Sequence, residues 1–149
     1  MSLKFQTVTG MKDLFEAEFV YFAKIEKICQ NMADFYGFQK IQTPILEQTE
    51  LFEKGTGLTT DIVEKEMYSL RTKGGDALTL RPEWTPAIVR AYLQHGLSAW
   101  PKPVKLWYLG PCFRHERPQA GRLRQFHQFG FEFLGVQDPM IDALTIQIF

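Results

Sequence analysis

Two segments of this sequence, residues 104–116 and 125–135, most constrain its fold because each shows the two-residue alternation of a β-strand. In the second segment the odd positions carry a histidine and three phenylalanines, whereas the even positions include Gln128, Gly130 and Glu132. We therefore predict two strands joined by a loop, with one aromatic face that packs into the core and one polar face.

The polar face continues onto the first strand, where Tyr108, Gly110, Arg114 and Glu116 share one side of the chain. Polar side chains beside glycines, backed by an aromatic face, predict a floor on which a small polar ligand lies. A sheet face open to solvent explains the same pattern, and the alternation alone does not choose between the two interpretations.

The rest of the chain alternates between helices and short extended segments, which predicts an α+β fold: an antiparallel sheet with flanking helices. Apolar side chains at helical spacing favour a long first helix that stops at Gly37, and paired glycines favour a tight hairpin turn. The expected elements are a helix over 15–36, an extended segment over 37–47, a short helix over 49–54, a hairpin over 66–82, a helix over 86–95 with Thr85 as its N-cap, and a helix opened by Asp138 and Pro139.

The formal net charge is zero, because seventeen Lys and Arg residues balance seventeen Asp and Glu residues. The overall charge therefore gives no argument for binding to nucleic acid or to an anionic membrane. The stretch from Phe113 to Phe126 differs, since it holds four arginines and one glutamate and so carries a net charge of +3. We interpret this stretch as a local anion-binding site.

The two cysteines, Cys29 and Cys112, lie far apart and form no CxxC pair, so neither a disulfide scaffold nor a zinc site is predicted. A reducing compartment suits such cysteines. No apolar run approaches the roughly 18 residues of a membrane span, and the first residues lack the apolar core of a secretory signal. We expect a cytoplasmic protein without a membrane partner.

Residues 113–133, with the sequence FRHERPQAGRLRQFHQFGFEF, resemble motif 2 of the class II aminoacyl-tRNA synthetases in the form found in the histidyl-tRNA synthetase family. The shared pattern is Arg-x-Glu, a loop, and then Arg-x-x-x-Phe. Three more segments are similar to that family in the same order: FQKIQTPILE (38–47), TDIVEKEMYSL (60–70) and LTLRPEWTPAIVRA (78–91). The resemblance extends from TGMKD (9–13) to the end of the chain and implies part of a class II catalytic core.

The family joins histidine to ATP, releases pyrophosphate, and transfers the histidyl group to the terminal adenosine of histidine tRNA. Arg114 matches the catalytic arginine that contacts the α-phosphate and the amino acid carboxylate. Glu116 matches the acid that binds the adenine amino group, Phe126 the ring that stacks on adenine, and Arg122 an arginine that reaches the terminal phosphates. The structural alternatives are an Arg114–Glu116 salt bridge, a core phenylalanine and a solvated loop arginine. The implied Mg²⁺ is held mainly by ATP phosphates, so no protein metal site is predicted.

The resemblance also implies a site for the amino acid. Glu83, Thr85 and Gln128 match positions that hold the α-ammonium group of histidine. Glu132 matches the acid that binds the imidazole, and a buried carboxylate there rejects amino acids that lack the ring N–H donor. Trp84 departs from the family pattern, in which a small residue, usually glycine, stands between the Glu and the Thr, and this departure leaves the shape of the pocket open.

The motif 2 loop approaches the acceptor end of the tRNA in this family, where histidine tRNA carries an additional 5′ guanosine. Arg117 and Gln119 are the candidates for that contact, Gln119 through a base edge, with an exposed loop position as the alternative. Pro44 matches the motif 1 proline at the dimer interface of the class and implies a homodimer; otherwise it only bends a strand. His115 and His127 have the parity of the core-facing side, and metal ligation by them is not expected.

The last residues, DPMIDALTIQIF, continue an apolar helical stripe without a stop signal. The family continues with an RGLDYY segment, a motif 3 arginine for ATP and an anticodon-binding domain, which this sequence lacks. We expect residues 1–149 to be the N-terminal portion of the catalytic domain and to be inactive alone. Two alternatives are a non-catalytic paralogue that serves as regulatory subunit of ATP phosphoribosyltransferase in histidine biosynthesis, which the complete motif 2 argues against, and a synthetase-like domain that senses uncharged tRNA.

Overall fold

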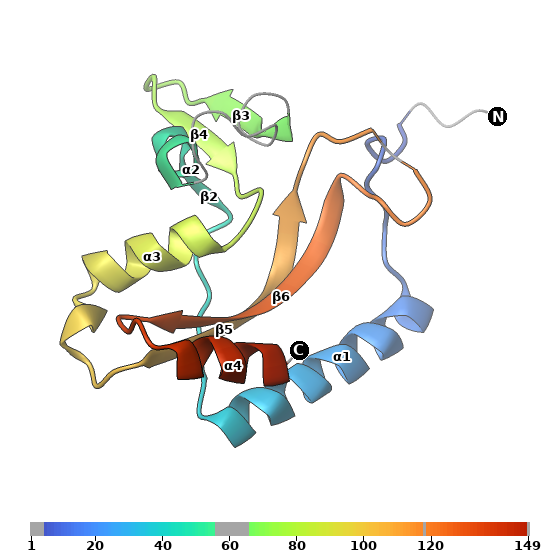
Figure 1. Cartoon of the computed structure of the whole chain (residues 1–149). Helices are drawn as coiled ribbons and strands as arrows, with labels where there is room; N and C mark the ends of the chain where they lie inside the picture. Colours follow the sequence, from blue (N-terminus) through green and yellow to red (C-terminus); the bar gives the residue numbers. More distant parts are fainter. Residues whose placement is uncertain (1–4, 56–65, 118, 149) are drawn as a thin grey trace.

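The computed structural model describes residues 5–55, 66–117 and 119–148, which form two three-stranded sheets flanked by four α-helices (Figure 1). Residues 60–65 of the TDIVEKEMYSL segment lie outside these ranges. Within the described ranges, no helix is both long and apolar enough to cross a membrane. The elements in chain order are α1 (Glu16–Tyr36), β1 (Gln39–Lys40), β2 (Leu46–Gln48), α2 (Thr49–Gly55), β3 (Tyr68–Arg71), β4 (Ala77–Leu80), α3 (Thr85–Gln94), the 3₁₀ helix η2 (Leu97–Ala99), β5 (Val104–Phe113), β6 (Gln125–Leu134) and α4 (Pro139–Ile148).

The strands β5 and β6 form the hairpin predicted from the alternation and pair antiparallel along their whole length. Strand β5 ends at Phe113, so the prediction that it continues to Glu116 is wrong. The Arg114 amide still donates to the carbonyl of Arg124 at 2.9 Å, but the next amide, that of His115, donates to the carbonyl of Glu66 at 2.7 Å, so the backbone leaves the β6 side after Arg114. Arg114 and Glu116 therefore follow the strand instead of belonging to it.

The extended segment expected over 37–47 is divided between the two sheets. Gln39–Lys40 forms β1, which pairs in parallel with β5, so the main sheet β1-β5-β6 is not purely antiparallel. Leu46–Gln48 forms β2, which joins the antiparallel sheet β2-β4-β3. Pro44 lies exposed between the two strands, where the absence of an N–H group costs no ladder hydrogen bond.

The hairpin predicted over 66–82 is confirmed as β3 and β4. Its turn is closed by the amide of Thr72, which donates to the carbonyl of Asp76 at 3.0 Å. Gly75 has a φ of 95° within this turn, a conformation that glycine adopts without steric cost. The paired glycines of the sequence therefore serve the backbone of the turn, as expected.

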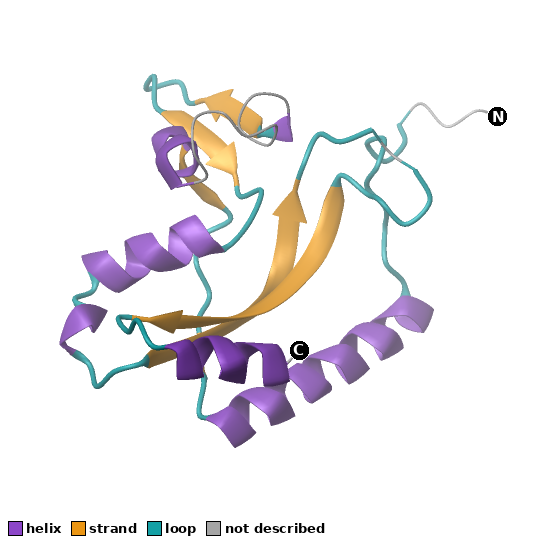
Figure 2. Ribbon diagram, in the orientation of Figure 1, coloured by secondary structure: helices purple, strands orange, loops and turns teal. Residues whose placement is uncertain are grey.

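The core of the protein lies on both faces of the β5–β6 hairpin (Figure 2). The predicted aromatic face packs against α1 and α4, where Trp107 and Phe131 cluster with Ala33 and Ile148. The even-numbered residues of β5 are also buried, because Trp84 and α3 cover them. The prediction of a single core face is therefore wrong, because buried residues pack on the second face as well.

The helix ends follow the sequence in two of three cases. Gly37 ends α1 with a φ of 73°, and the Asp138 carboxylate accepts a backbone N–H in the first turn of α4. The third prediction, that Thr85 caps α3, is wrong: the N-cap residue is Trp84, and no side chain caps the helix. The Thr85 hydroxyl instead donates to the Glu132 carboxylate, which ties the start of α3 to β6.

Candidate active site

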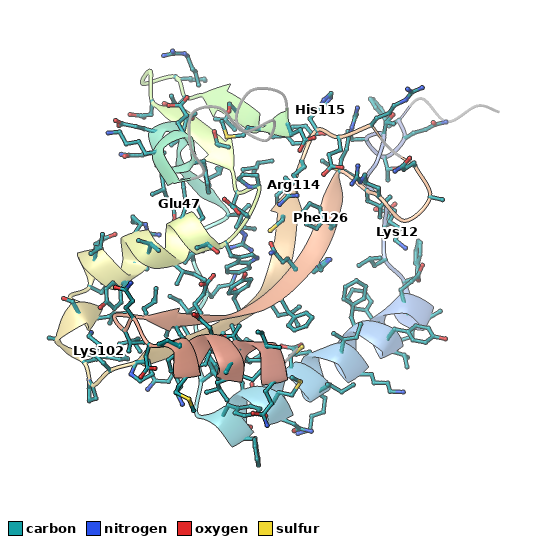
Figure 3. All side chains as sticks on the ribbon, in the orientation of Figure 1. Lys12, Glu47, Lys102, Arg114, His115 and Phe126 are labelled. Carbon is teal, nitrogen blue, oxygen red and sulfur yellow. The ribbon has the colours of Figure 1, made fainter. Side chains whose placement is uncertain are left out.

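The loop end of the β5–β6 hairpin brings Arg114 and Phe126 together (Figure 3). The Arg114 Nε donates to the carbonyl of Pro82 at 3.0 Å, which fixes this side chain between the hairpin and the segment that precedes α3. The Arg114 guanidinium carbon lies 5.2 Å from the centre of the Phe126 ring. Phe126 is half-buried, and its ring packs at the edge of the cluster around Trp84.

Glu116 lies beside Arg114 and contacts two cations. Its Oε2 is 2.8 Å from Arg122 Nε, and its Oε1 is 3.9 Å from Arg114 Nη1. The predicted alternative of an Arg114–Glu116 salt bridge is therefore present as a long contact, while Arg122 is the nearer partner. The Glu116 side chain is 13% exposed and that of Arg122 is 60% exposed, so the pair joins a shielded acid to a loop arginine.

A second polar cluster lies farther along the same face, formed by the start of α3 and by β6. The Thr85 Oγ1 donates to Glu132 Oε1 at 2.7 Å, and Glu83 precedes Thr85 by two residues. The Gln128 Oε1 accepts a hydrogen bond from the Cys112 thiol at 3.5 Å. Burial raises the pKa of that thiol to about 11, so it stays protonated and can donate.

The acids of this second cluster titrate above their usual range. Burial raises the pKa of Glu83, and the positive charge of Arg114 partly opposes that rise. Burial also raises the pKa of Glu132, against the hydrogen bond from Thr85. A cluster so rich in acceptors can bind a ligand that supplies N–H donors and positive charge.

Tyr108 belongs to this cluster, although the sequence analysis did not select it as a site residue. Its ring centre lies 4.8 Å from that of Trp84, nearly parallel at 18°, and burial followed by the charge of Glu132 raises the pKa of its hydroxyl. The hydroxyl occupies the space over Gly130, where a Cβ would lie 2.3 Å from it. The signal in the sequence was the hairpin register, which places Tyr108 directly opposite Gly130.

The glycines of the polar face accommodate the protein's own side chains. A Cβ at Gly110 would lie 2.8 Å from the Trp84 ring and 3.1 Å from the Arg81 guanidinium. Gly110 and Gly130 therefore make room for Trp84, Arg81 and Tyr108, and the ligand floor predicted beside these glycines stays a prediction. Trp84 is fully buried between this face and Arg81, whose guanidinium carbon is 3.5 Å from the ring centre, so its ring is a core element beneath the candidate pocket.

A cavity of about 1120 Å³ opens beside this cluster, between α2 and α3. Its wall includes Glu83 and Thr85, the exposed Pro44, and an ion pair between Arg90 and Glu47. Figure 3 shows Glu47 on the α2 side of the molecule, across from Arg114. The cavity therefore gives the Glu83–Thr85 end of the site an approach from outside.

The arginines of the loop between β5 and β6 differ in exposure and in their contacts. Arg117 and Gln119 are exposed. Gln119 and Arg122 close the tip through backbone hydrogen bonds of 3.3 and 2.9 Å. Arg124 differs, because its guanidinium turns back and donates to two backbone carbonyls. Because Arg124 is held by contacts within the chain, fewer of the four arginines in this basic stretch are available to bind an anion than its net charge suggests.

The histidines of the hairpin lie in two different surroundings. His127 is on the predicted face, with its ring 4.7 Å from Phe22 of α1, although it remains exposed. His115 does not face the core as predicted, because β5 has ended before it; it is exposed beside the Tyr68 ring. Among the described residues, no group of three or more His, Cys, Asp or Glu side chains is arranged to hold a metal ion.

A sequence model of the family described as "Histidyl-tRNA synthetase" matches residues 10–149. This chain belongs to the histidyl-tRNA synthetase family. It is 52% identical over 139 residues to the histidine–tRNA ligase of Desulforudis audaxviator, and 51% identical over 141 residues to that of Thermus thermophilus. The alignments cover 93% and 95% of this chain but 33% and 34% of those ligases, so the chain spans about a third of their length.

Solved structures place the fold in the same histidyl-tRNA synthetase family. The apo enzyme of S. aureus superposes with a TM-score of 0.80 at 34% identity, covering 97% of this chain and 33% of that one. A protein of Bacillus halodurans described as an ATP phosphoribosyltransferase regulatory subunit/histidyl-tRNA synthetase superposes with a TM-score of 0.78 at 25% identity, covering 99% and 37%. The predicted α+β fold, part of a synthetase catalytic core, is confirmed.

Proposed function

We propose that this chain forms the ATP- and histidine-binding part of a histidine–tRNA ligase. In the first step a carboxylate oxygen of histidine attacks the α-phosphorus of ATP, the bond from that phosphorus to the bridging oxygen breaks, and pyrophosphate leaves. In the second step a ribose hydroxyl of the terminal adenosine of histidine tRNA attacks the activated carbonyl, and AMP leaves.

The position of Arg114 between Glu116 and Glu83 is the observation that carries this proposal. Its guanidinium is 3.9 Å from Glu116 on one side, and its charge partly opposes the burial that raises the pKa of Glu83 on the other. The reaction requires two anions, a carboxylate and a phosphate, to meet. A fixed and permanently charged guanidinium at the junction of an adenine site and an amino acid site stabilises the transition state of that encounter.

The residues around Arg114 fit ATP as a substrate. Phe126 supplies a ring for stacking on adenine, and Glu116 supplies a shielded carboxylate that accepts a hydrogen bond from the adenine amino group. Because Glu116 is paired with Arg122 in this structure, ATP binding exchanges that ion pair for two new contacts, adenine on Glu116 and a terminal phosphate on Arg122. Mg²⁺ enters with the nucleotide, held mainly by its phosphates.

The second cluster fits the amino group and side chain of histidine. Glu83 and Gln128 accept hydrogen bonds from the α-ammonium group, with Thr85 beside them. Glu132 accepts the imidazole N–H, and its hydrogen bond from Thr85 orients the carboxylate for that contact. An amino acid without the ring N–H leaves this half-buried acid unsatisfied, which is the physical basis of selectivity.

Our proposals for tRNA binding, dimerisation and location rest on the family resemblance and on which side chains are exposed. Arg117 and Gln119 are exposed at the loop, and they are our candidates for contact with the acceptor end of histidine tRNA. Pro44 is exposed between the two sheets and is our candidate for the interface of a homodimer. We propose the cytoplasm as the location of this reaction.

A regulatory subunit of ATP phosphoribosyltransferase that senses histidine is the second candidate, because the Bacillus halodurans protein is described as an ATP phosphoribosyltransferase regulatory subunit/histidyl-tRNA synthetase and has the same fold. The presence of Arg114, Glu116 and Phe126 favours the ligase, since a sensor of histidine has no need of a nucleotide site. A domain that senses uncharged tRNA is the third candidate, and catalytic activity separates it from the ligase.

The test is a chimera in which residues 10–149 replace the matching third of the Thermus thermophilus ligase, to which this chain is 51% identical. We expect histidine-dependent pyrophosphate exchange, and Arg114→Ala should lower its rate by about 10² or more. Arg71→Ala, an exposed position on β3, is the matched control and should leave the rate unchanged. A chimera that folds cooperatively but exchanges equally well with and without Arg114 contradicts the proposal.

A further inference from the structure

The N-terminal turn packs against the base of the motif 2 loop, although 115 residues separate Thr9 from Arg124. Figure 1 shows this segment beside the connection between β5 and β6, and Lys12 is labelled there in Figure 3. The carbonyl of Gly10 accepts hydrogen bonds from the amides of Arg124 at 2.7 Å and Gln125 at 3.3 Å. The Arg124 guanidinium donates in turn to the Thr9 carbonyl at 3.4 Å.

Only glycine fits at position 10 of this turn. Gly10 has a φ of 81°, and a Cβ there would lie 2.7 Å from Cγ, 2.9 Å from Cδ and 3.0 Å from Cβ of Arg124. These atoms form the base of the Arg124 side chain, whose backbone is held by the hydrogen bond to Gly10. The side chain therefore cannot swing away without breaking the contact between the turn and the loop.

Arg124 links this turn to two of the residues proposed to bind ATP, Arg114 and Glu116. Its backbone carbonyl accepts the amide of Arg114 at 2.9 Å, and its Nε donates to the backbone carbonyl of Glu116 at 3.1 Å. One residue thus holds the backbones of the proposed α-phosphate and adenine ligands in register. The described contacts of its guanidinium are to carbonyl groups, which a planar fork of donors matches better than a point charge does.

We propose that Arg124 is a positioning residue for ATP binding and that the Thr9–Gly10 turn is the buttress that holds it. Arg124 acts through Arg114 and Glu116 and makes no contact with the nucleotide itself. The ATP readout of this inference rests on the proposed function. The mechanical link between turn and loop is a property of the chain and is measurable without any ligand.

The experiment compares Gly10→Ala with Gly37→Ala, a matched control that also has positive φ, 73°, but at which a Cβ meets nothing within 4 Å. Hydrogen–deuterium exchange at the amides of Arg114 and Arg124, and trypsin cleavage after Arg122, report the position of the loop. We expect both to rise by about fivefold or more in Gly10→Ala, the scale of one lost hydrogen bond, and to remain unchanged in Gly37→Ala.

The same variants are then made in the chimera with the Thermus thermophilus ligase and titrated with ATP, together with Arg124→Met and Arg124→Lys. We expect Gly10→Ala and Arg124→Met to weaken ATP binding by about fivefold, while Gly37→Ala does not, even where both glycine variants melt at the same lowered temperature. Arg124→Lys should not restore the affinity for ATP, because lysine keeps the positive charge but lacks the planar guanidinium with its several N–H donors.

Two results overturn the positioning role. One is equal loop protection in Gly10→Ala and Gly37→Ala, and the other is full recovery of ATP affinity by Arg124→Lys, which would show that Arg124 attracts phosphate by its charge. If the unsubstituted chimera does not bind ATP, the nucleotide part of the proposed function fails, and exchange and proteolysis still decide whether the turn positions the loop.

Discussion

Replacing Trp84 by alanine tests how the residue that departs from the family pattern supports the site. Trp84 is completely buried, stacks on Tyr108 at 4.8 Å and lies under the Arg81 guanidinium at 3.5 Å. Its ring also passes over Gly110, where a Cβ would come within 2.8 Å of it. The indole and the glycine are therefore complementary, and each substitution should change the effect of the other.

The expected magnitudes follow from these contacts. Removing a buried tryptophan side chain costs about 3–5 kcal/mol of unfolding free energy, a large part of the roughly 5–15 kcal/mol of a whole domain. Gly110→Ala in the unsubstituted chain forces a methyl group against the Trp84 ring and should cost about 1–3 kcal/mol. In the Trp84→Ala background that methyl group enters the vacated space, so the same substitution should cost nothing or stabilise.

The assay is equilibrium urea unfolding of the four proteins of this double-mutant cycle, followed by circular dichroism. We expect a coupling energy of about 1–3 kcal/mol with a reversed or abolished effect of Gly110→Ala. Gly75→Ala, at a glycine where a Cβ meets nothing within 4 Å, is the control and should cost the same in both backgrounds. Additive effects of Trp84→Ala and Gly110→Ala refute the packing argument.

The other predictions concern titration, tRNA and the chain alone. Burial raises the folded-state pKa of Glu132 above its usual 4.5, so the native state holds the proton more tightly and its stability falls as the pH rises through that range. Glu132→Gln should therefore gain stability relative to the parent as the pH rises above the usual pKa of 4.5 in urea titrations, and parallel pH profiles would contradict this. In the chimera, Gln119→Ala should reduce discrimination between histidine tRNA with and without the additional 5′ guanosine while adenylate formation is unchanged. Undiminished discrimination would show that Gln119 is only an exposed loop residue. The 149-residue chain by itself should show little histidine-dependent pyrophosphate exchange, because it spans only about a third of the length of the ligases that it matches, and exchange near the rate of a complete synthetase would disprove this.

The candidate site shows where sequence reasoning stopped. The motif selected Arg114, Glu116 and Phe126, and the structure brings them to one end of the hairpin. The motif did not select Tyr108, because its importance depends on the glycine opposite it in the register. It also counted Arg124 among the charges of an anion site, although that side chain is engaged by carbonyl groups from the N-terminal turn.

The sequence by itself determined the elements whose signals are local. The helical spacing before Gly37, the alternation in β5 and β6, and the glycines of the β3–β4 turn each depend on residues a few positions apart, so they could be predicted without knowing the packing. Tertiary structure decided the rest: the division of residues 37–47 between two sheets, the burial of Trp84 under Arg81, and the turn of the Thr85 hydroxyl from capping to Glu132. These outcomes depend on partners far away in the chain, because a side chain's final contact is set by which groups the fold brings within reach and by whether buried polar atoms find a partner there.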